Sequence, residues 1–158
     1  MRAERHLRLK ETVRAAEYVV KIVLVRGVTM ELEEMGAKVL ICDDEEVLRS
    51  LVRAALAPRG FELLEARDGD EAVAAARRHV PDLILLDLMM PRRSGIEVLG
   101  ALQDDPELAA VPVLMLTART QETDRAAALG AGVRRFLPKP FTLAELKAAV
   151  DELLEEPR

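Results

Sequence analysis

Short apolar runs alternate with amphipathic stretches along most of this chain, and this alternation restricts the fold more than any other feature. The runs lie at residues 39–42, 61–66, 83–86, 111–116 and 133–137. Each has the length of a strand, and most are nearly continuous rather than alternating between apolar and polar residues. Strands of this kind are covered on both faces, as in a parallel sheet with helices on either side.

Segments of helical period follow the runs, at residues 47–55, 72–80, 95–102, 122–129 and 142–153. In the first segment one helical face is formed by Val47, Leu51, Ala54 and Ala55. The last segment opens with Thr142 and Glu145, a capping box in which two side chains satisfy each other's unpaired backbone N–H groups. Five strand–helix units in succession require right-handed crossovers and therefore parallel strands. We expect a doubly wound α/β fold with a five-stranded parallel sheet between two helical layers.

Residues 1–36 do not share this rhythm, so we treat them as an N-terminal extension and residues 37–158 as the domain. The extension has two readings that stay open. Residues 19–25 are β-branched enough to form a strand. A helical face is also present, formed by Leu9, Val13, Ala16 and Val20. Met30 and Met35 precede the first strand, so part of the extension could also come from an upstream start of translation.

Composition excludes several classes of protein. Half of the residues are hydrophobic and 32% are charged, which suits a globular domain. The single cysteine, Cys42, excludes an internal disulfide and a Cys-rich metal site, and the two histidines, His6 and His79, lie too far apart in sequence to suggest a ligand pair. No apolar stretch approaches the roughly 20 residues of a membrane helix, so we expect no membrane insertion and a cytoplasmic location. Residues 30–158 carry sixteen basic and twenty-five acidic side chains, so we expect no direct binding to nucleic acid.

Polar residues follow the predicted strands at the edge where an open parallel sheet gathers its functional groups. Asp43 and Asp44 follow the first run, Asp87 the third, Thr117 the fourth and Lys139 the fifth. Three carboxylates repel one another unless a cation lies between them, and oxygen donors favour Mg²⁺. A carboxylate in such a place can attack phosphorus, while Mg²⁺, the ammonium and the hydroxyl stabilise the transferring group.

Four stretches resemble the signatures of the receiver domain of two-component response regulators. They are VLICDD at 39–44, LDLMMPRRSG at 86–95, LTA at 116–118 and FLPKPF at 136–141. They occur in order, each after its own strand, over about residues 38–155. The resemblance is to the single-domain, chemotaxis-regulator type, and it implies a flavodoxin-like sheet with strand order 2-1-3-4-5.

The resemblance also implies roles in a phosphorelay. Asp87 would accept a phosphoryl group from the phosphohistidine of a sensor histidine kinase or phosphotransfer protein. The Mg²⁺ ligands would be Asp43, Asp44, Asp87 and the backbone carbonyl of Met89, and Lys139 would pair with the phosphoryl group. Such a protein supports its own phosphorylation and slow dephosphorylation rather than acting as a conventional enzyme.

Thr117 and Phe136 would form the switch pair, in which Thr117 moves to the phosphoryl group and Phe136 turns inward. Output would pass to a downstream protein through residues 119–154, and the resemblance also allows a homodimer that forms on phosphorylation.

Because the chain ends soon after the last predicted helix, we expect a stand-alone receiver. Phe136 lacks the hydroxyl of a tyrosine, and Arg134 and Arg135 precede it, which leaves the partner's identity open. We also expect a cis peptide between Lys139 and Pro140, where the chain turns sharply.

Simpler interpretations and other functions remain open at this point. Asp44 could only cap the first helix, Thr117 could be an ordinary strand end and Lys139 a solvated charge. An aspartyl-phosphate phosphatase or phosphotransferase is one alternative, although Met89 stands where its usual second carboxylate would be. A phosphorylation-independent interaction module is another, and the complete set of five polar residues argues against it.

Overall fold

The computed structural model describes residues 23–25, 28–30, 36–118, 126, 128–130 and 132–156. The chain divides into two compact units, Met1–Gly36 and Ala37–Arg158. In the first unit, β1 (Val23–Val25) pairs antiparallel with β2 (Val28–Met30). The strand reading of the extension therefore holds at Val23–Val25, whereas the residues of the alternative helical face lie outside the described part of the chain.

The second unit contains a five-stranded sheet in which every strand pair is parallel. Its strands are β3 (Lys38–Cys42), β4 (Glu62–Ala66), β5 (Leu83–Asp87), β6 (Val113–Ala118) and β7 (Arg135–Lys139). They lie in the order β4-β3-β5-β6-β7. Numbered along the domain this is 2-1-3-4-5, so the predicted fold class and strand order are confirmed.

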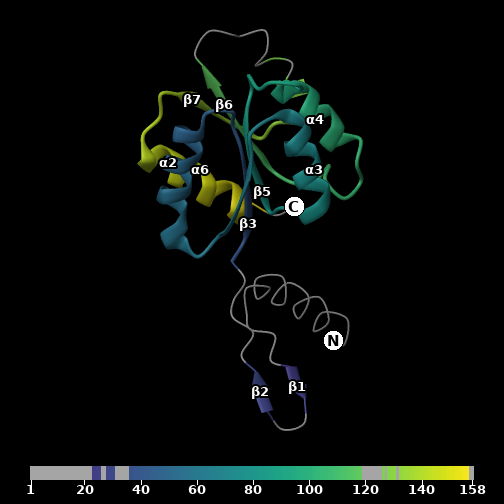
Figure 1. The fold of residues 1–158 in the computed structure, drawn as a ribbon, viewed down its shortest axis with the longest axis vertical. Coiled ribbons are helices and arrows are strands. Elements are labelled where there is room, and N and C mark those ends of the chain that lie inside the picture. Colours follow the sequence, from purple (N-terminus) through teal and green to yellow (C-terminus); the bar gives the residue numbers. More distant parts are fainter. Residues whose placement is uncertain are drawn as a thin grey trace, which may run out of the picture. The chain divides into compact units, whose positions relative to one another are not determined.

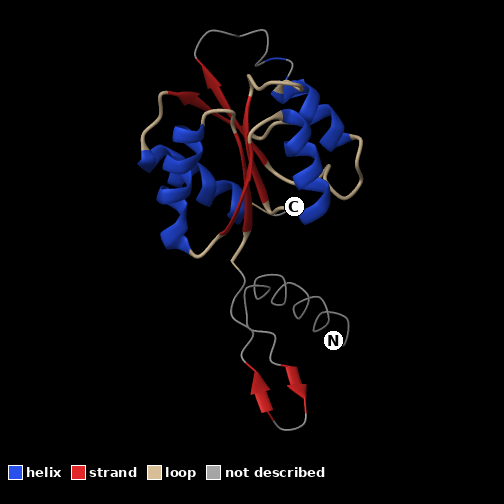
Figure 2. Ribbon diagram, viewed as in Figure 1, coloured by secondary structure: helices blue, strands red, loops and turns tan. Residues whose placement is uncertain are grey.

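Helices cover both faces of this sheet, as Figures 1 and 2 show. One face carries α2 (Glu46–Leu56) and α6 (Leu143–Glu155), and the other carries α3 (Gly69–His79) and α4 (Gly95–Gln103). A short 3-10 turn, η1 (Ala57–Arg59), follows α2. The helix expected at 122–129 lies largely outside the described residues. None of the described helices is both long and apolar enough to cross a membrane.

The core consists of two clusters, one on each face of the sheet. Along β3, Leu40 and Cys42 join the cluster beneath α3 and α4, and Val39 and Ile41 join the cluster beneath α2 and α6. All five residues of β5 are buried. Because successive side chains of a strand point to opposite faces, a sheet covered on both sides needs apolar residues at every position. This requirement explains the continuous apolar runs of the sequence.

Two predicted strands begin too early, because β6 and β7 each start two residues later than their apolar runs. Pro112 has no N–H to give to the ladder, and the N–H of Val111 bonds to the carbonyl of Leu108 in the preceding turn. The N–H of Val133 bonds to the carbonyl of Ala128. Both strands also end two residues later than their runs, so Thr117 and Lys139 lie within strands instead of after them.

The face predicted for the first helix is wrong. Val47 is 82% exposed and Leu51 46% exposed, whereas the buried residues of α2 are Val52, Ala55 and Leu56. The sequence contains two apolar stripes one residue apart, both compatible with helical period. The stripe with the larger side chains faces the sheet, since burying more apolar area stabilises the fold more.

The ends of two helices are fixed by capping boxes. Thr142 and Glu145 cap α6 as predicted, and Ser94 and Glu97 cap α4 in the same way. In each box the bond from the helix N-terminus lowers the pKa of the glutamate. The Lys139–Pro140 peptide is cis, which confirms that prediction.

Candidate functional site

Three carboxylates meet at the carboxyl edge of the sheet. Asp43 and Asp44 follow β3, and Asp87 is the last residue of β5. One oxygen from each lies within 4.8 Å of the others. Asp43 and Asp87 are buried and Asp44 is exposed, so the cluster opens to solvent on the side of Asp44.

Lys139 brings a positive charge to this cluster from the end of β7. Its Nζ donates a hydrogen bond to Asp43 Oδ2 at 2.8 Å and lies 3.5 Å from Asp87 Oδ2. Burial by itself would lower the pKa of the ammonium, but the hydrogen bond to Asp43 and the charge of Asp87 outweigh it, so that the pKa is raised. Lys139 is therefore a charged member of the cluster and not a solvated surface residue.

Asp87 is the carboxylate whose ionisation is most altered. Burial and, after it, the charge of Asp43 raise the pKa of Asp87 to about 6, against the opposing effects of Lys139 and the backbone N–H of Met89. That N–H donates to Asp87 Oδ1 at 3.2 Å. At neutral pH the side chain is mostly ionised, which a nucleophilic carboxylate requires.

Asp43 is held from several directions. Its Oδ1 accepts the N–H of Glu45 at 2.9 Å, and its own N–H donates to the carbonyl of Ala66 at 3.1 Å. Glu45, and not Asp44, is the N-cap residue of α2, and its side chain makes no capping bond. The interpretation of Asp44 as the helix cap is therefore wrong, and the Asp44 carboxylate remains available to a ligand.

The remaining predicted residues, Thr117 and Phe136, lie on β6 and β7. In the sheet register Leu116 is paired with Asp87, so Thr117 is one residue further along β6 than the residue that faces Asp87. Phe136 is half-buried, pairs with Met115 and packs against the core beneath α3 and α4. The structure thus brings Asp43, Asp44, Asp87 and Lys139 together, and it leaves Phe136 behind them on β7.

The two methionines after Asp87 differ from each other. Met90 is half-buried and packs against the core, whereas Met89 is 60% exposed. Of the two side chains, only that of Met90 therefore packs against the domain. The two arginines before Phe136 pair with acidic residues at the end of α6, Arg135 with Glu152 and Arg134 with the C-cap residue Glu156.

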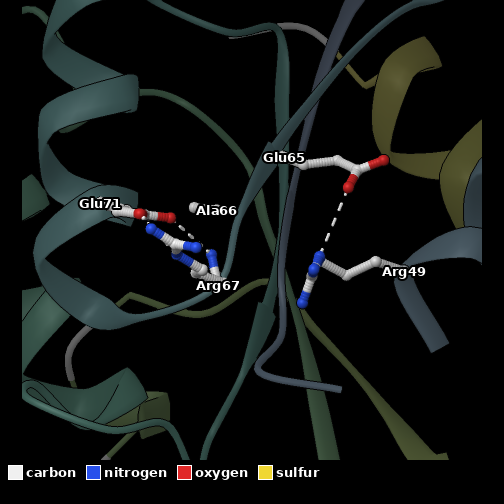
Figure 3. A pocket seen from close by; sticks show the side chains of 5 residues that line it. All are labelled: Arg49, Glu65, Ala66, Arg67 and Glu71. Atoms are coloured by element: carbon white, nitrogen blue, oxygen red, sulfur yellow. Dashed lines mark hydrogen bonds and ion pairs between the residues drawn. The ribbon is translucent and has the colours of Figure 1, made fainter. Parts of the chain in front are cut away.

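A polar hollow of about 230 Å³ is formed by residues of α2, β4 and α3 and of the loop between β4 and α3 (Figure 3). Its lining residues are Arg49, Glu65, Ala66, Arg67 and Glu71. The charged side chains are paired within the wall, Arg49 with Glu65 at 3.4 Å and Arg67 with Glu71 at 2.8 Å. Arg49, whose guanidinium reaches from this wall to the backbone of Asp43, was not among the residues predicted from the sequence.

Comparison with known proteins identifies the family. The family model of the response regulator receiver domain matches residues 39–151. The chain therefore belongs to the receiver domain family of two-component response regulators, whose members are regulatory domains of phosphorelay signalling.

Individual relatives agree with this assignment. The chain is 40% identical over 120 residues to the phosphate regulon regulator PhoB of Rhizobium meliloti. The matched region covers 76% of this chain and 53% of PhoB. It is 43% identical over 116 residues to the probable transcriptional regulator TcrX of Mycobacterium tuberculosis, and this match covers 73% of the chain and 49% of TcrX. The chain thus spans about half the length of the curated relatives it matches.

Solved structures share the fold over almost their whole length. The chemotaxis protein CheY4 of Vibrio cholerae superposes with a TM-score of 0.71 at 32% identity, covering 75% of this chain and 98% of that one. The receiver domain of the histidine kinase PA1611 from Pseudomonas aeruginosa superposes with a TM-score of 0.71 at 30% identity, and the match covers 77% of this chain and 99% of that domain. That structure holds a magnesium ion in its active-site cleft.

Proposed function

We propose that Asp87 accepts a phosphoryl group from a phosphohistidine of a sensor histidine kinase or phosphotransfer protein in the cytoplasm. The phosphorylated domain then binds a downstream protein. The observation that carries this proposal is the cluster of three carboxylates within 4.8 Å of one another, with the Lys139 ammonium against two of them. Membership of the receiver family supports it.

The donor set fits a magnesium ion. All the side-chain donors are carboxylate oxygens, and three negative charges face a single ammonium, so the cluster keeps an excess of negative charge. Asp43, Asp44 and Asp87, with the backbone carbonyl of Met89, would hold Mg²⁺. When bound, the ion offsets the negative charge that builds up on the transferring phosphoryl group.

Asp87 supplies the nucleophile. A carboxylate oxygen forms a bond to phosphorus, the phosphorus–nitrogen bond of the donor breaks, and the imidazole nitrogen leaves with the bonding electrons and takes up a proton. Lys139, 3.5 Å from Asp87 Oδ2, is close enough to pair with the incoming oxygens. Thr117 would donate its hydroxyl to one of them. The product is an acyl phosphate on Asp87.

Thr117 and Phe136 would link phosphorylation of Asp87 to a change at the protein surface. They lie on the adjacent strands β6 and β7, so a movement of Thr117 towards the phosphoryl group makes room behind it for the aromatic ring. The surface that would change is residues 119–154, part of which lies outside the described residues. We propose that this surface binds protein and not nucleic acid, since the domain is strongly acidic.

The test is phosphorylation by acetyl phosphate with Mg²⁺, followed by intact-mass measurement. We expect one added phosphoryl group on the unmodified chain, and none with EDTA or in Asp87→Asn. Asp104→Asn, a change of an exposed aspartate beyond α4, should be labelled normally. Undiminished labelling of Asp87→Asn would sink the proposal. Rapid, repeated release of phosphate from the donor would favour the phosphotransferase or phosphatase alternative.

A further inference from the structure

Arg49 lies in the second turn of α2 and points to the sheet rather than to solvent. Its Nη1 donates to the backbone carbonyl of Asp43 at 2.8 Å, and its side chain is only 12% exposed. Arginine is seldom this buried without a specific partner. No step of the proposed phosphoryl transfer uses this side chain.

The other side of the guanidinium faces β4. Arg49 Nε lies 3.4 Å from Glu65 Oε2, and Arg53 Nη1 lies 2.8 Å from the second oxygen of the same carboxylate. Figure 3 shows the Arg49 and Glu65 side chains pointing toward each other, joined by this ion pair. The next residue, Ala66, accepts the N–H of Asp43. Two adjacent residues of β4 therefore hold both backbone polar groups of Asp43, Ala66 directly and Glu65 through Arg49.

Holding this carbonyl also fixes the next residue. The carbonyl of Asp43 and the N–H of Asp44 belong to one planar peptide group, so its orientation sets the direction in which Asp44 leaves the strand. Among the described residues, none makes a hydrogen bond or ion pair with the Asp44 carboxylate. The position of Asp44 thus depends on its backbone.

We propose that Arg49 is a positioning residue for the carboxylate cluster. It orients the peptide between Asp43 and Asp44, so that the exposed Asp44 carboxylate stays within ligand distance of the two buried ones. This inference rests on the proposed function, because it presumes that the three carboxylates hold Mg²⁺. Arg49 does not touch the phosphoryl group in this arrangement, so it acts on the affinity for the ion and not on the transfer itself.

The test compares Arg49→Met with Arg53→Met in the full chain. Both variants remove a guanidinium that faces Glu65, but only Arg49 bonds to Asp43. By isothermal titration with MgCl₂ we expect Arg49→Met to weaken Mg²⁺ binding by about tenfold, as loss of a group that orients metal ligands commonly does. At saturating Mg²⁺, its phosphorylation rate with acetyl phosphate should return to within about threefold of the unmodified chain, and Arg53→Met should keep both quantities within about twofold.

A measurement without metal separates positioning from simple stabilisation. Amide hydrogen exchange at Asp44 and Glu45 should accelerate in Arg49→Met and stay unchanged in Arg53→Met, while exchange in the core strands stays slow in both. If Arg49→Met does not fold, Arg49→Lys replaces it, because an ammonium keeps the charge but lacks the planar fork. Equal Mg²⁺ affinity in the Arg49 variant and the unmodified chain, or equal losses in the two methionine variants, overturns this inference alone. If the unmodified chain takes up neither Mg²⁺ nor a phosphoryl group, the proposed function fails with it.

Discussion

Lys139 lies closer to Asp43 than to Asp87, with its Nζ 2.8 Å from an oxygen of the first and 3.5 Å from an oxygen of the second. The ammonium is thus bonded to an oxygen of a carboxylate that is a ligand in the proposed Mg²⁺ site. Binding of Mg²⁺ to Asp43 would release Lys139 towards Asp87, the proposed phosphoryl acceptor. The same side chain would then oppose binding of the ion and assist the transfer.

Lys139→Met should separate these two effects. Without the competing ammonium, the carboxylates should bind Mg²⁺ more tightly, by roughly tenfold, because an opposite charge no longer shares Asp43. Phosphorylation by acetyl phosphate should be slower by about a hundredfold, since no cation pairs with the phosphoryl oxygens. Isothermal titration and intact-mass kinetics measure the two quantities, with Lys147→Met on α6 as the control. A loss of Mg²⁺ affinity in Lys139→Met would contradict the competition.

The raised pKa of Asp87 predicts a pH-dependent stability. Without Mg²⁺, the folded chain keeps a proton on Asp87 up to about pH 6, whereas the unfolded chain releases it near pH 3.9. The contribution of this group is therefore fully present below pH 3.9 and is lost as the pH rises through 6. Asp87→Asn does not titrate, so its free energy of unfolding relative to the unmodified chain should rise between pH 4 and 7, on the order of 1 kcal/mol. Urea unfolding in EDTA at several pH values measures this difference, and a constant difference would contradict it.

Gly95 should not tolerate a side chain. A Cβ at this position would lie 2.5 Å from the backbone oxygen of Asp87 and 2.8 Å from the Cα of Leu88. Gly95→Ala should therefore cost about 1–3 kcal/mol in unfolding free energy and also slow phosphorylation, because the backbone of Asp87 must shift. Gly100→Ala on the same helix is the matched control, since nothing lies within 4 Å of its Cβ, and it should stabilise the fold by up to about 1 kcal/mol. Similar urea midpoints for the two variants would show that the contact is harmless.

Val80 is a strained residue at the end of α3. Its φ of 43° lies in the left-handed region, which β-branched residues rarely adopt, and its side chain is 39% exposed. Val80→Gly should raise the free energy of unfolding by about 0.5–1 kcal/mol, because relief of the steric cost exceeds the entropy that glycine loses. Val80→Ala keeps a Cβ, so its free energy of unfolding should rise by less than that of Val80→Gly. Thermal and urea unfolding of both variants would decide, and a destabilised glycine variant would show that the Val80 side chain contributes by packing.

Removal of residues 1–29 should leave phosphorylation intact. The sheet, both core clusters and the carboxylate cluster are formed by residues beyond Gly36. A chain that starts at Met30 should unfold cooperatively and take up one phosphoryl group at the rate of the full chain. Aggregation or loss of uptake would mean that the extension packs on the domain, and that the boundary at residue 36 is misplaced.

The five parallel strands could be predicted from the sequence, because buried parallel strands leave continuous apolar runs and their ends carry polar residues. Their order was implied only by the resemblance of the motifs to the receiver family. The first residues of β6 and β7 could not be predicted from the sequence. Pro112 and Val133 are apolar and extend the runs, yet Pro112 lacks an N–H and Val133 bonds back to Ala128. The buried face of α2 was also ambiguous, because two apolar stripes overlap and only the packing selects between them.

The carboxylates and Lys139 were found because charged residues stand out where buried strands end. Arg49 was missed for a physical reason. An arginine four residues into an amphipathic helix usually lies in solvent, and its bond to a backbone carbonyl leaves no trace in residue type or spacing. Asp44 was assigned a possible capping role on its residue type, whereas the N-cap of α2 is one residue later, at Glu45, and the helix begins at Glu46.

The contacts of Asp43 have a consequence for the timing of synthesis. Its partners are Glu45, Arg49, Ala66 and Lys139, and the last is 96 positions further along the chain. A ribosome-bound chain that has not yet released β7 lacks the cation that bonds to Asp43. Under the proposed function, a kinase that met such a nascent chain would find carboxylates without their counter-charge, so phosphoryl transfer would wait for the folding of β7.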